Sequence, residues 1–135
     1  MKAIADTGLL VAMLRESDQY HAWGIEVAEQ ISWPALTCEA VLAEVAFRLQ
    51  SSQEVLGMLR DKIVRVALNC ERETENLYGL ALRYADHNPD LADVCLIRMS
   101  ELYPQHRVIT TDESDFRIYR RNKREVIPLL CPPKK

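Results

Sequence analysis

The sequence predicts an α/β fold in which helices cover both faces of a central parallel sheet. Two observations support this prediction. Short apolar segments alternate along the chain with longer segments whose apolar residues recur at helical spacing. Acidic residues follow several of the short segments, and open α/β sheets bind their ligands at the carboxyl ends of strands. Alternation of this kind implies parallel strands joined by right-handed crossovers.

The predicted elements follow from these two patterns. The short apolar segments predict strands over residues 2–5, 35–37, 63–68, 107–111 and 126–130. Helical spacing predicts helices from about 9 to 14, 18 to 31, 38 to 50, 53 to 61, 72 or 73 to 85 and 91 to 103, and a short one from about 114. Gly8 permits a tight turn out of the first strand, and Asp18 is a candidate N-cap for the second helix.

Length and composition limit the class of protein. The 135 residues fit one domain, residues 1–135, whose last residues 131–135 we expect to be a frayed tail. Hydrophobic residues make up 48%, so the chain can bury a core, and the net charge of −3 neither requires nor excludes a nucleic-acid partner. No apolar run approaches the roughly 18 residues of a membrane span, and Asp6 interrupts the N-terminal apolar run, which argues against a signal peptide.

The four cysteines are widely spaced and form no C-x-x-C pair, which argues against a zinc site. Free thiols in apolar helical patterns pack as small hydrophobic groups. We therefore expect a reducing, cytoplasmic location.

Two predicted helices each carry an acid at the margin of an apolar stripe. Glu44 lies about 60° outside the stripe of the helix over 38–50, and Asp93 stands in the same relation to the stripe of the helix over 91–103. Asp6 and Asp112 directly follow predicted strands. If these four carboxylates meet, they repel one another and raise each other's pKa values unless a cation neutralises them.

The chemistry of such a cluster would be that of a hard metal site. Oxygen ligands without histidine or cysteine select Mg²⁺ or Mn²⁺. These ions activate water and stabilise charge on a phosphoryl group. The pattern therefore favours metal-assisted phosphodiester hydrolysis.

Each acid also has a local structural interpretation, and spacing alone does not decide between the two. Asp6 could form a turn or cap a helix, and Glu44 could pair with Arg48 four residues later. Asp93 could belong to a capping box, and Asp112 could cap the short helix that follows it.

Four blocks of sequence resemble the PIN domain family, and specifically the small bacterial ribonucleases that act as VapC-type toxins in toxin–antitoxin pairs. The blocks are Ile4–Leu10, Thr37–Leu49, Asp90–Leu96 and Thr110–Phe116, and the last of them has the pattern T-x-D-x-x-D-F. The similarity extends over nearly the whole chain. It rests on four acids in the same order as in the family.

The resemblance implies a three-layer α/β/α sandwich and an Mg²⁺ or Mn²⁺ site for hydrolysis of single-stranded RNA. It places Asp6, Glu44, Asp93 and Asp112 on the catalytic and metal-binding quartet, with Asp115 and Thr110 as accessory residues. Gly8 stands where the family often has serine. Family members are usually homodimers, and the toxins are inhibited by a peptide of an antitoxin protein.

A basic cluster follows the last block. It consists of Arg117, Arg120, Arg121, Lys123 and Arg124. The cluster could clamp RNA phosphates beside the metal, or it could be an ordinary solvated face.

Two other functions compete with the ribonuclease prediction. A phosphotransfer receiver domain also has acids at strand ends, but it should carry adjacent acids after its first strand, where Asp6 stands alone. A non-catalytic protein-interaction module with the PIN fold would keep the architecture without binding a cation.

Overall fold

The computed structural model describes residues 1–134 of the chain. Its strands are β1 (Ala3–Ala5), β2 (Ala35–Thr37), β3 (Val64–Val66), β4 (Arg107–Ile109), β5 (Arg120–Arg121), β6 (Glu125–Val126) and β7 (Leu129–Leu130). Its α-helices are α1 (Thr7–Leu14), α2 (His21–Ala28), α3 (Glu39–Leu49), α4 (Ser52–Arg60), α5 (Thr74–Arg83), α6 (Leu91–Leu102) and α7 (Glu113–Ile118). A short 3-10 helix, η1 (Ala85–His87), follows α5.

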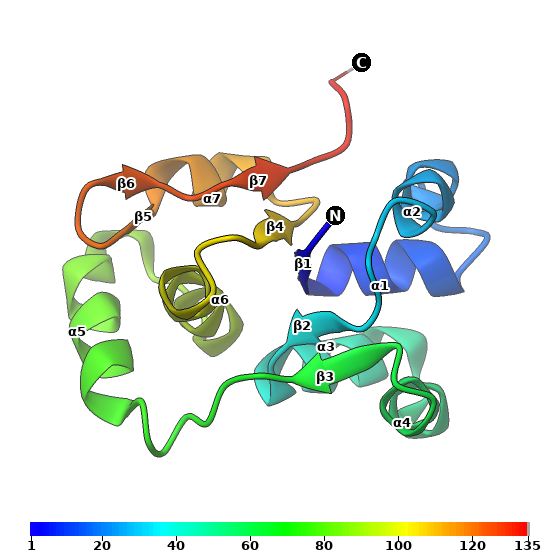
Figure 1. Cartoon of the computed structure of the whole chain (residues 1–135), viewed down its shortest axis with the longest axis horizontal. Helices are drawn as coiled ribbons and strands as arrows, with labels where there is room; N and C mark the ends of the chain where they lie inside the picture. Colours follow the sequence, from blue (N-terminus) through cyan, green and yellow to red (C-terminus); the bar gives the residue numbers. More distant parts are fainter. Residues whose placement is uncertain (135) are drawn as a thin grey trace.

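Five strands form one parallel sheet in the order β3-β2-β1-β4-β7 (Figure 1). β1 is central, and its Ile4 is in register with Leu36 on one side and Val108 on the other. The predicted α/β fold with a central parallel sheet is therefore confirmed. The order also argues against a receiver domain, whose sheet runs 2-1-3-4-5.

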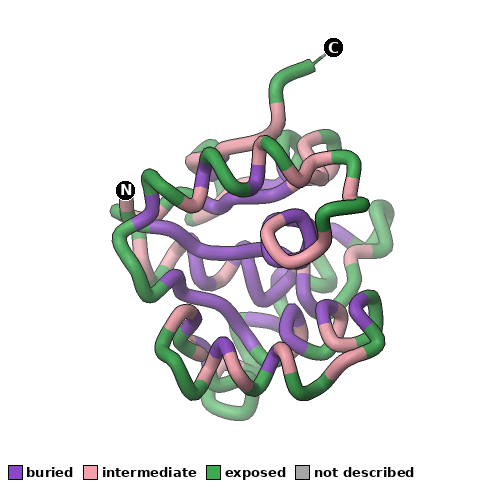
Figure 2. The backbone as a smooth tube through the Cα atoms, turned by 90° about the vertical axis from the view of Figure 1, so that its right-hand side faces the viewer, coloured by how far each residue is buried: buried purple, intermediate pink, exposed green. Residues whose placement is uncertain are grey.

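Helices flank the sheet on both sides. Figure 1 shows α1 and α2 on one side of β1 and α5 and α6 on the other. This arrangement follows from right-handed crossovers, because the chain moves along the sheet in one direction from β1 to β3 and returns in the other direction to β4. The central strands β1 and β2 are fully buried, and exposed segments lie at the periphery (Figure 2).

The first connection differs in detail from the prediction. α2 begins at His21, and Asp18 does not cap it: its Oδ2 accepts a hydrogen bond from the Tyr20 amide at 3.0 Å and closes the preceding turn. The helix ends at Ala28 and not at Ile31. The chain leaves the helix there because Ile31 is buried in the core and the Ser32 amide bonds to the Met1 carbonyl at 2.8 Å.

The last predicted strand, 126–130, is divided into two. β6 pairs antiparallel with β5, and β7 pairs parallel with β4. Pro128 has no amide proton with which to continue a ladder, although its carbonyl accepts from the Val108 amide at 2.8 Å. The β5–β6 hairpin turns through Asn122 and Lys123, both at positive φ, and it contains none of the glycines that mark such turns in a sequence.

The chain after β7 has no regular secondary structure as far as residue 134 and extends away from the body of the protein (Figure 2). Lys135, the last residue of the predicted frayed tail, lies outside the described residues. Within residues 1–134, no helix is both long enough and apolar enough to cross a membrane.

Candidate functional site

The site is built where the sheet order reverses, at the carboxyl ends of β1 and β4. Ligands of open α/β sheets bind at such a switch point. Thr110 joins the two strand ends. Its Oγ1 donates to Asp6 Oδ2 at 2.5 Å and accepts from the Asp112 amide at 2.9 Å. Thr110 is fully buried, so it fixes Asp6 relative to the segment that carries Asp112.

Asp6 both caps a helix and lies in the site. Its Oδ1 accepts from the Thr7 amide at 2.7 Å at the start of α1, which agrees with the local interpretation. The side chain is buried, and this burial raises the pKa of Asp6, although the hydrogen bonds from Thr110 and Thr7 oppose the shift. The capping role and the site role are compatible because each uses a different carboxylate oxygen.

Glu44 reaches the same region from α3. Its Oε2 accepts from Thr7 Oγ1 at 3.2 Å. The alternative ion pair with Arg48 is not formed, since Arg48 pairs instead with Asp18 at 3.8 Å. Partial burial, followed by the charge of Asp90, raises the pKa of Glu44.

Asp93 enters the site from the first turn of α6. Its amide is capped by Asp90 Oδ1 at 2.8 Å, while its own carboxylate accepts from the Tyr119 hydroxyl at 3.2 Å. The capping interpretation is therefore correct for the Asp93 backbone but does not account for its side chain. Burial, together with the charges of Asp90 and Asp6, raises the pKa of Asp93 to about 7.

Three carboxylates form the tightest group. One oxygen each from Asp93, Asp112 and Asp115 lie within 4.8 Å of one another. Burial is the main cause that raises the pKa of Asp112, and interaction with Asp115 adds to it. Such a group can bind a metal ion, because a cation between the carboxylates would offset both the burial and the repulsion.

The composition of this group differs from the predicted metal set. Asp115, predicted as an accessory residue, belongs to the tightest group, whereas Asp6 and Glu44 lie outside it. The charge of Asp6 still raises the pKa values of Asp93 and Asp112, so Asp6 remains part of the same electrostatic cluster. The structure thus brings the predicted acids close together, but the three carboxylates that lie closest to one another are not all members of the predicted quartet.

Two residues of the site had no predicted role there. The charge of Asp90 raises the pKa values of Asp6, Glu44 and Asp93, so Asp90 lies close to all of them. Asp90 stands three residues before Asp93 at a helix start, and residues at this spacing are neighbours on a helix. The sequence could therefore have indicated that Asp90 lies near Asp93. Tyr119 is buried and donates to Asp93. No local pattern points from Tyr119 to a residue 26 positions earlier.

The predicted basic cluster divides into two kinds of residue. Arg121 is largely buried and donates to the Ser100 and Pro104 carbonyls at 3.1 and 3.2 Å, and Arg120 donates to the Arg117 carbonyl at 2.7 Å. These two guanidinium groups hold the backbone in place. The other three, Arg117, Lys123 and Arg124, are exposed, and Arg117 pairs with Glu113 at 3.0 Å.

The comparisons with known proteins add no family assignment. No protein-family model matches the chain, and no curated protein matches its sequence significantly. Membership of the PIN domain family therefore stays a prediction that rests on the four blocks of sequence.

Proposed function

We propose that this protein is a divalent-cation-dependent ribonuclease that hydrolyses phosphodiester bonds of single-stranded RNA. The observation that supports the proposal best is the group formed by Asp93, Asp112 and Asp115, whose oxygens lie within 4.8 Å of one another at the switch point of the sheet. Burial raises the pKa values of Asp93 and Asp112, and partly buried acids with raised pKa values are typical of functional sites.

The donor set fits Mg²⁺ or Mn²⁺. All three groups are carboxylates, and hard oxygen ligands suit these two ions. When bound, such an ion lowers the pKa of a coordinated water and stabilises charge on a phosphoryl oxygen. Asp93, Asp112 and Asp115 would hold the ion.

The remaining residues of the site would orient these ligands. Thr110 fixes the segment before Asp112, and Tyr119 orients the Asp93 carboxylate by its hydrogen bond. Asp6 and Glu44 would add negative charge around the ion without belonging to the tightest group. The exposed Arg117, Lys123 and Arg124 are the candidates for phosphate contacts.

The choice of RNA rests on the resemblance to VapC-type toxins, as do the toxin role, an antitoxin partner, a homodimer and a cytoplasmic location. The cluster of acids is compatible with any phosphodiester. The experiment must therefore test substrate and cation separately.

The test measures cleavage of an end-labelled single-stranded RNA and of a DNA with the same sequence, each with Mg²⁺, Mn²⁺ or excess EDTA. We expect cleavage of the RNA alone, and only with a cation. Asp93→Asn should lower the rate at least about 100-fold, because it removes a ligand charge. Asp86→Asn, an exposed acid in η1, is the matched control and should keep full activity.

Undiminished cleavage in EDTA or in Asp93→Asn would overturn the cation-dependent mechanism. Cation binding without cleavage of either polymer would favour the non-catalytic interaction module. Cleavage of the DNA alone would support cation-dependent phosphodiester hydrolysis but would contradict RNA as the substrate.

A further inference from the structure

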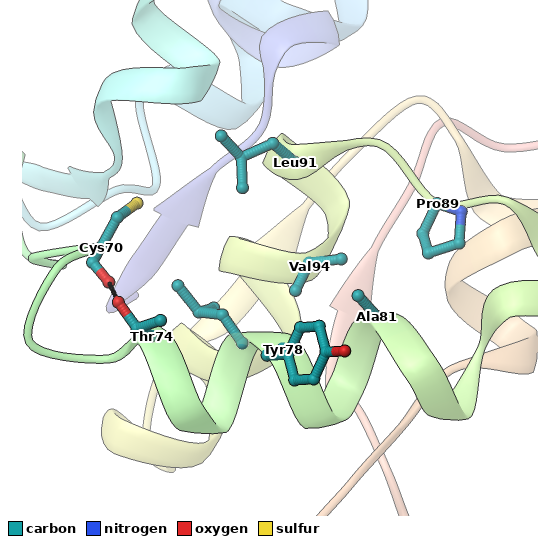
Figure 3. Close-up of a pocket in the computed structure, with 8 residues that line it drawn as sticks. Cys70, Thr74, Tyr78, Ala81, Pro89, Leu91 and Val94 are labelled. Atoms are coloured by element: carbon teal, nitrogen blue, oxygen red, sulfur yellow. Dashed lines mark hydrogen bonds between the residues drawn. The ribbon is translucent and has the colours of Figure 1, made fainter.

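Two cysteines that play no part in the proposed site lie in contact. The Sγ atoms of Cys70 and Cys95 are 3.6 Å apart. Cys70 is exposed in the turn that precedes α5, and Cys95 is fully buried in α6. Figure 3 shows Cys70 at the end of a groove between α5 and α6, with its sulfur directed away from Thr74.

The backbone around the pair can bring the two sulfurs together. A disulfide bond is about 2.05 Å long, so the sulfurs must approach by roughly 1.5 Å. Cys95 is held inside a buried helix, whereas residues 67–73 form loop and turns without regular secondary structure. A small shift of the turn at Cys70 is enough.

We propose that Cys70 and Cys95 form a redox-active pair that closes to a disulfide when the protein meets a peroxide. The proposal does not depend on the proposed ribonuclease function. In a reducing compartment the pair would be open at rest, since intracellular disulfides are mostly transient.

The reaction balances with hydrogen peroxide as the oxidant. Cys70 sulfur attacks one peroxide oxygen, the O–O bond breaks, and a sulfenic acid and one water result. Cys95 sulfur then attacks the Cys70 sulfur, the S–O bond breaks, and a second water leaves. Two thiols lose two electrons and two protons, and the peroxide is reduced to two waters.

The positions of the four cysteines select this pair. Cys70 is the exposed one of the four, so it is the one an oxidant can reach most easily. Cys38 also lies beside Cys95, but it is fully buried, so an oxidant reaches it less easily than Cys70. Cys131 lies beyond β7 in a pocket with Tyr20 and Pro133. Cys95 is therefore the thiol placed to resolve an oxidised Cys70.

Closing the bond should stabilise the fold. The two cysteines are 25 residues apart, and a cross-link over such a loop restricts the unfolded chain. We expect a rise of about 5 °C or more in Tm for the oxidised protein.

The test treats the reduced full chain with hydrogen peroxide under native conditions, followed by blocking of free thiols and digestion with trypsin without reductant. Each cysteine falls in a different tryptic peptide, and the relevant ones cover residues 66–72 and 84–98. We expect these two peptides to be joined with the loss of two hydrogen atoms. Dithiothreitol should reverse both the link and the rise in Tm.

Cys70→Ser is the decisive variant, because its exposed position in a turn leaves the fold intact even if a change at buried Cys95 does not. Cys70→Ser should give no cross-link and no rise in Tm, and Cys131→Ser should behave like the unaltered protein. Three results would overturn the proposal: oxidation that stops at Cys70 sulfenic or sulfinic acid, a link to Cys38 or Cys131, or a link between two chains.

Discussion

At the scale of single residues, Asp93 shows how burial and neighbouring charges act on one acid of the cluster. Its pKa is raised from an ordinary value near 4 to about 7, first by burial and then by neighbouring acids. Between these two values the folded protein binds a proton that the unfolded chain has released. The contribution of Asp93 to stability therefore falls as the pH rises from about 4 to 7, in the absence of a cation.

Asp93→Asn should remove this contribution. In cation-free buffer we expect the variant and the unaltered protein to have similar Tm values near pH 4, and the variant to become the more stable of the two as the pH rises to 8. Thermal denaturation across this range measures the difference. The exposed control Asp86→Asn should show no such divergence. If the difference in Tm between the variant and the unaltered protein stayed constant with pH, Asp93 would be ionised over the whole range.

Gly8 is needed for a close approach and not for the turn that the sequence suggested. Its φ is not positive, and it lies inside α1. A Cβ atom at this position would lie 2.0 Å from Thr111 Oγ1, next to Asp112. This contact gives a physical reason for glycine at a position where the PIN domain family, which the sequence resembles, often has serine.

Gly8→Ala should therefore cost about 1–3 kcal/mol of the free energy of unfolding. Thr111→Gly, which removes the clashing side chain, should restore part of that loss when the two changes are combined. A double-mutant cycle by chemical denaturation measures the coupling. Additive effects of the two changes would show that the clash is relieved elsewhere.

The residue-scale predictions that concerned one helix turn were correct in some cases and wrong in others, since Asp18 does not cap α2 and Glu44 does not pair with Arg48. Asp6 caps α1 and Asp90 caps α6, as local patterns indicate. The bond from Thr110 to Asp6 spans 104 positions, and no local pattern could reveal it. For Asp6 and Asp93 the two interpretations proved compatible, because Asp6 uses a different carboxylate oxygen for each role and Asp93 uses its backbone amide for one and its side chain for the other. The side chain of Asp112, in contrast, does not cap α7.

At the scale of elements, periodicity located the segments that carry the site. It placed Glu44 and Asp93 at the margin of the core, and both are half-buried. It missed the β5–β6 hairpin, because a turn without glycine between two-residue strands gives almost no signal. The basic residues consequently looked like one continuous cluster, although the hairpin directs them to different surroundings.

The hairpin predicts unequal effects for two of its arginines. Arg121 is held by the Ser100 and Pro104 carbonyls at the end of α6, so Arg121→Ala should cost about 1–3 kcal/mol of stability by leaving these carbonyls without a donor. Arg124→Ala, at an exposed position of the same hairpin, should change stability by less than about 0.5 kcal/mol. Urea denaturation of both variants checks this. Equal losses would mean that Arg121 does not anchor the hairpin.

At the scale of the whole molecule, the order of the strands decides what the acids can do. β1 and β4 are adjacent although about a hundred residues separate them, and this adjacency brings Asp6 beside Asp112. Alternation of strands and helices predicts a parallel sheet but does not fix which strands are neighbours. The sequence could therefore suggest convergence of the acids only through a family resemblance. Only the structure shows that Asp115, and not Asp6 or Glu44, lies closest to Asp93 and Asp112.

Binding of a cation should stabilise the whole fold and distinguish the tightest group from the predicted quartet. A ligand at 100 times its Kd raises the free energy of unfolding by about 2.7 kcal/mol, so Mn²⁺ should raise Tm by several degrees. Asp115→Asn should abolish most of this rise, because Asp115 contributes one of the three closely spaced carboxylates. Glu44→Gln, outside the group, should keep most of it. If Glu44→Gln instead abolished the rise and Asp115→Asn preserved it, the cation would be held by the quartet that the sequence predicted, and the three-acid group would be only a feature of the cation-free protein.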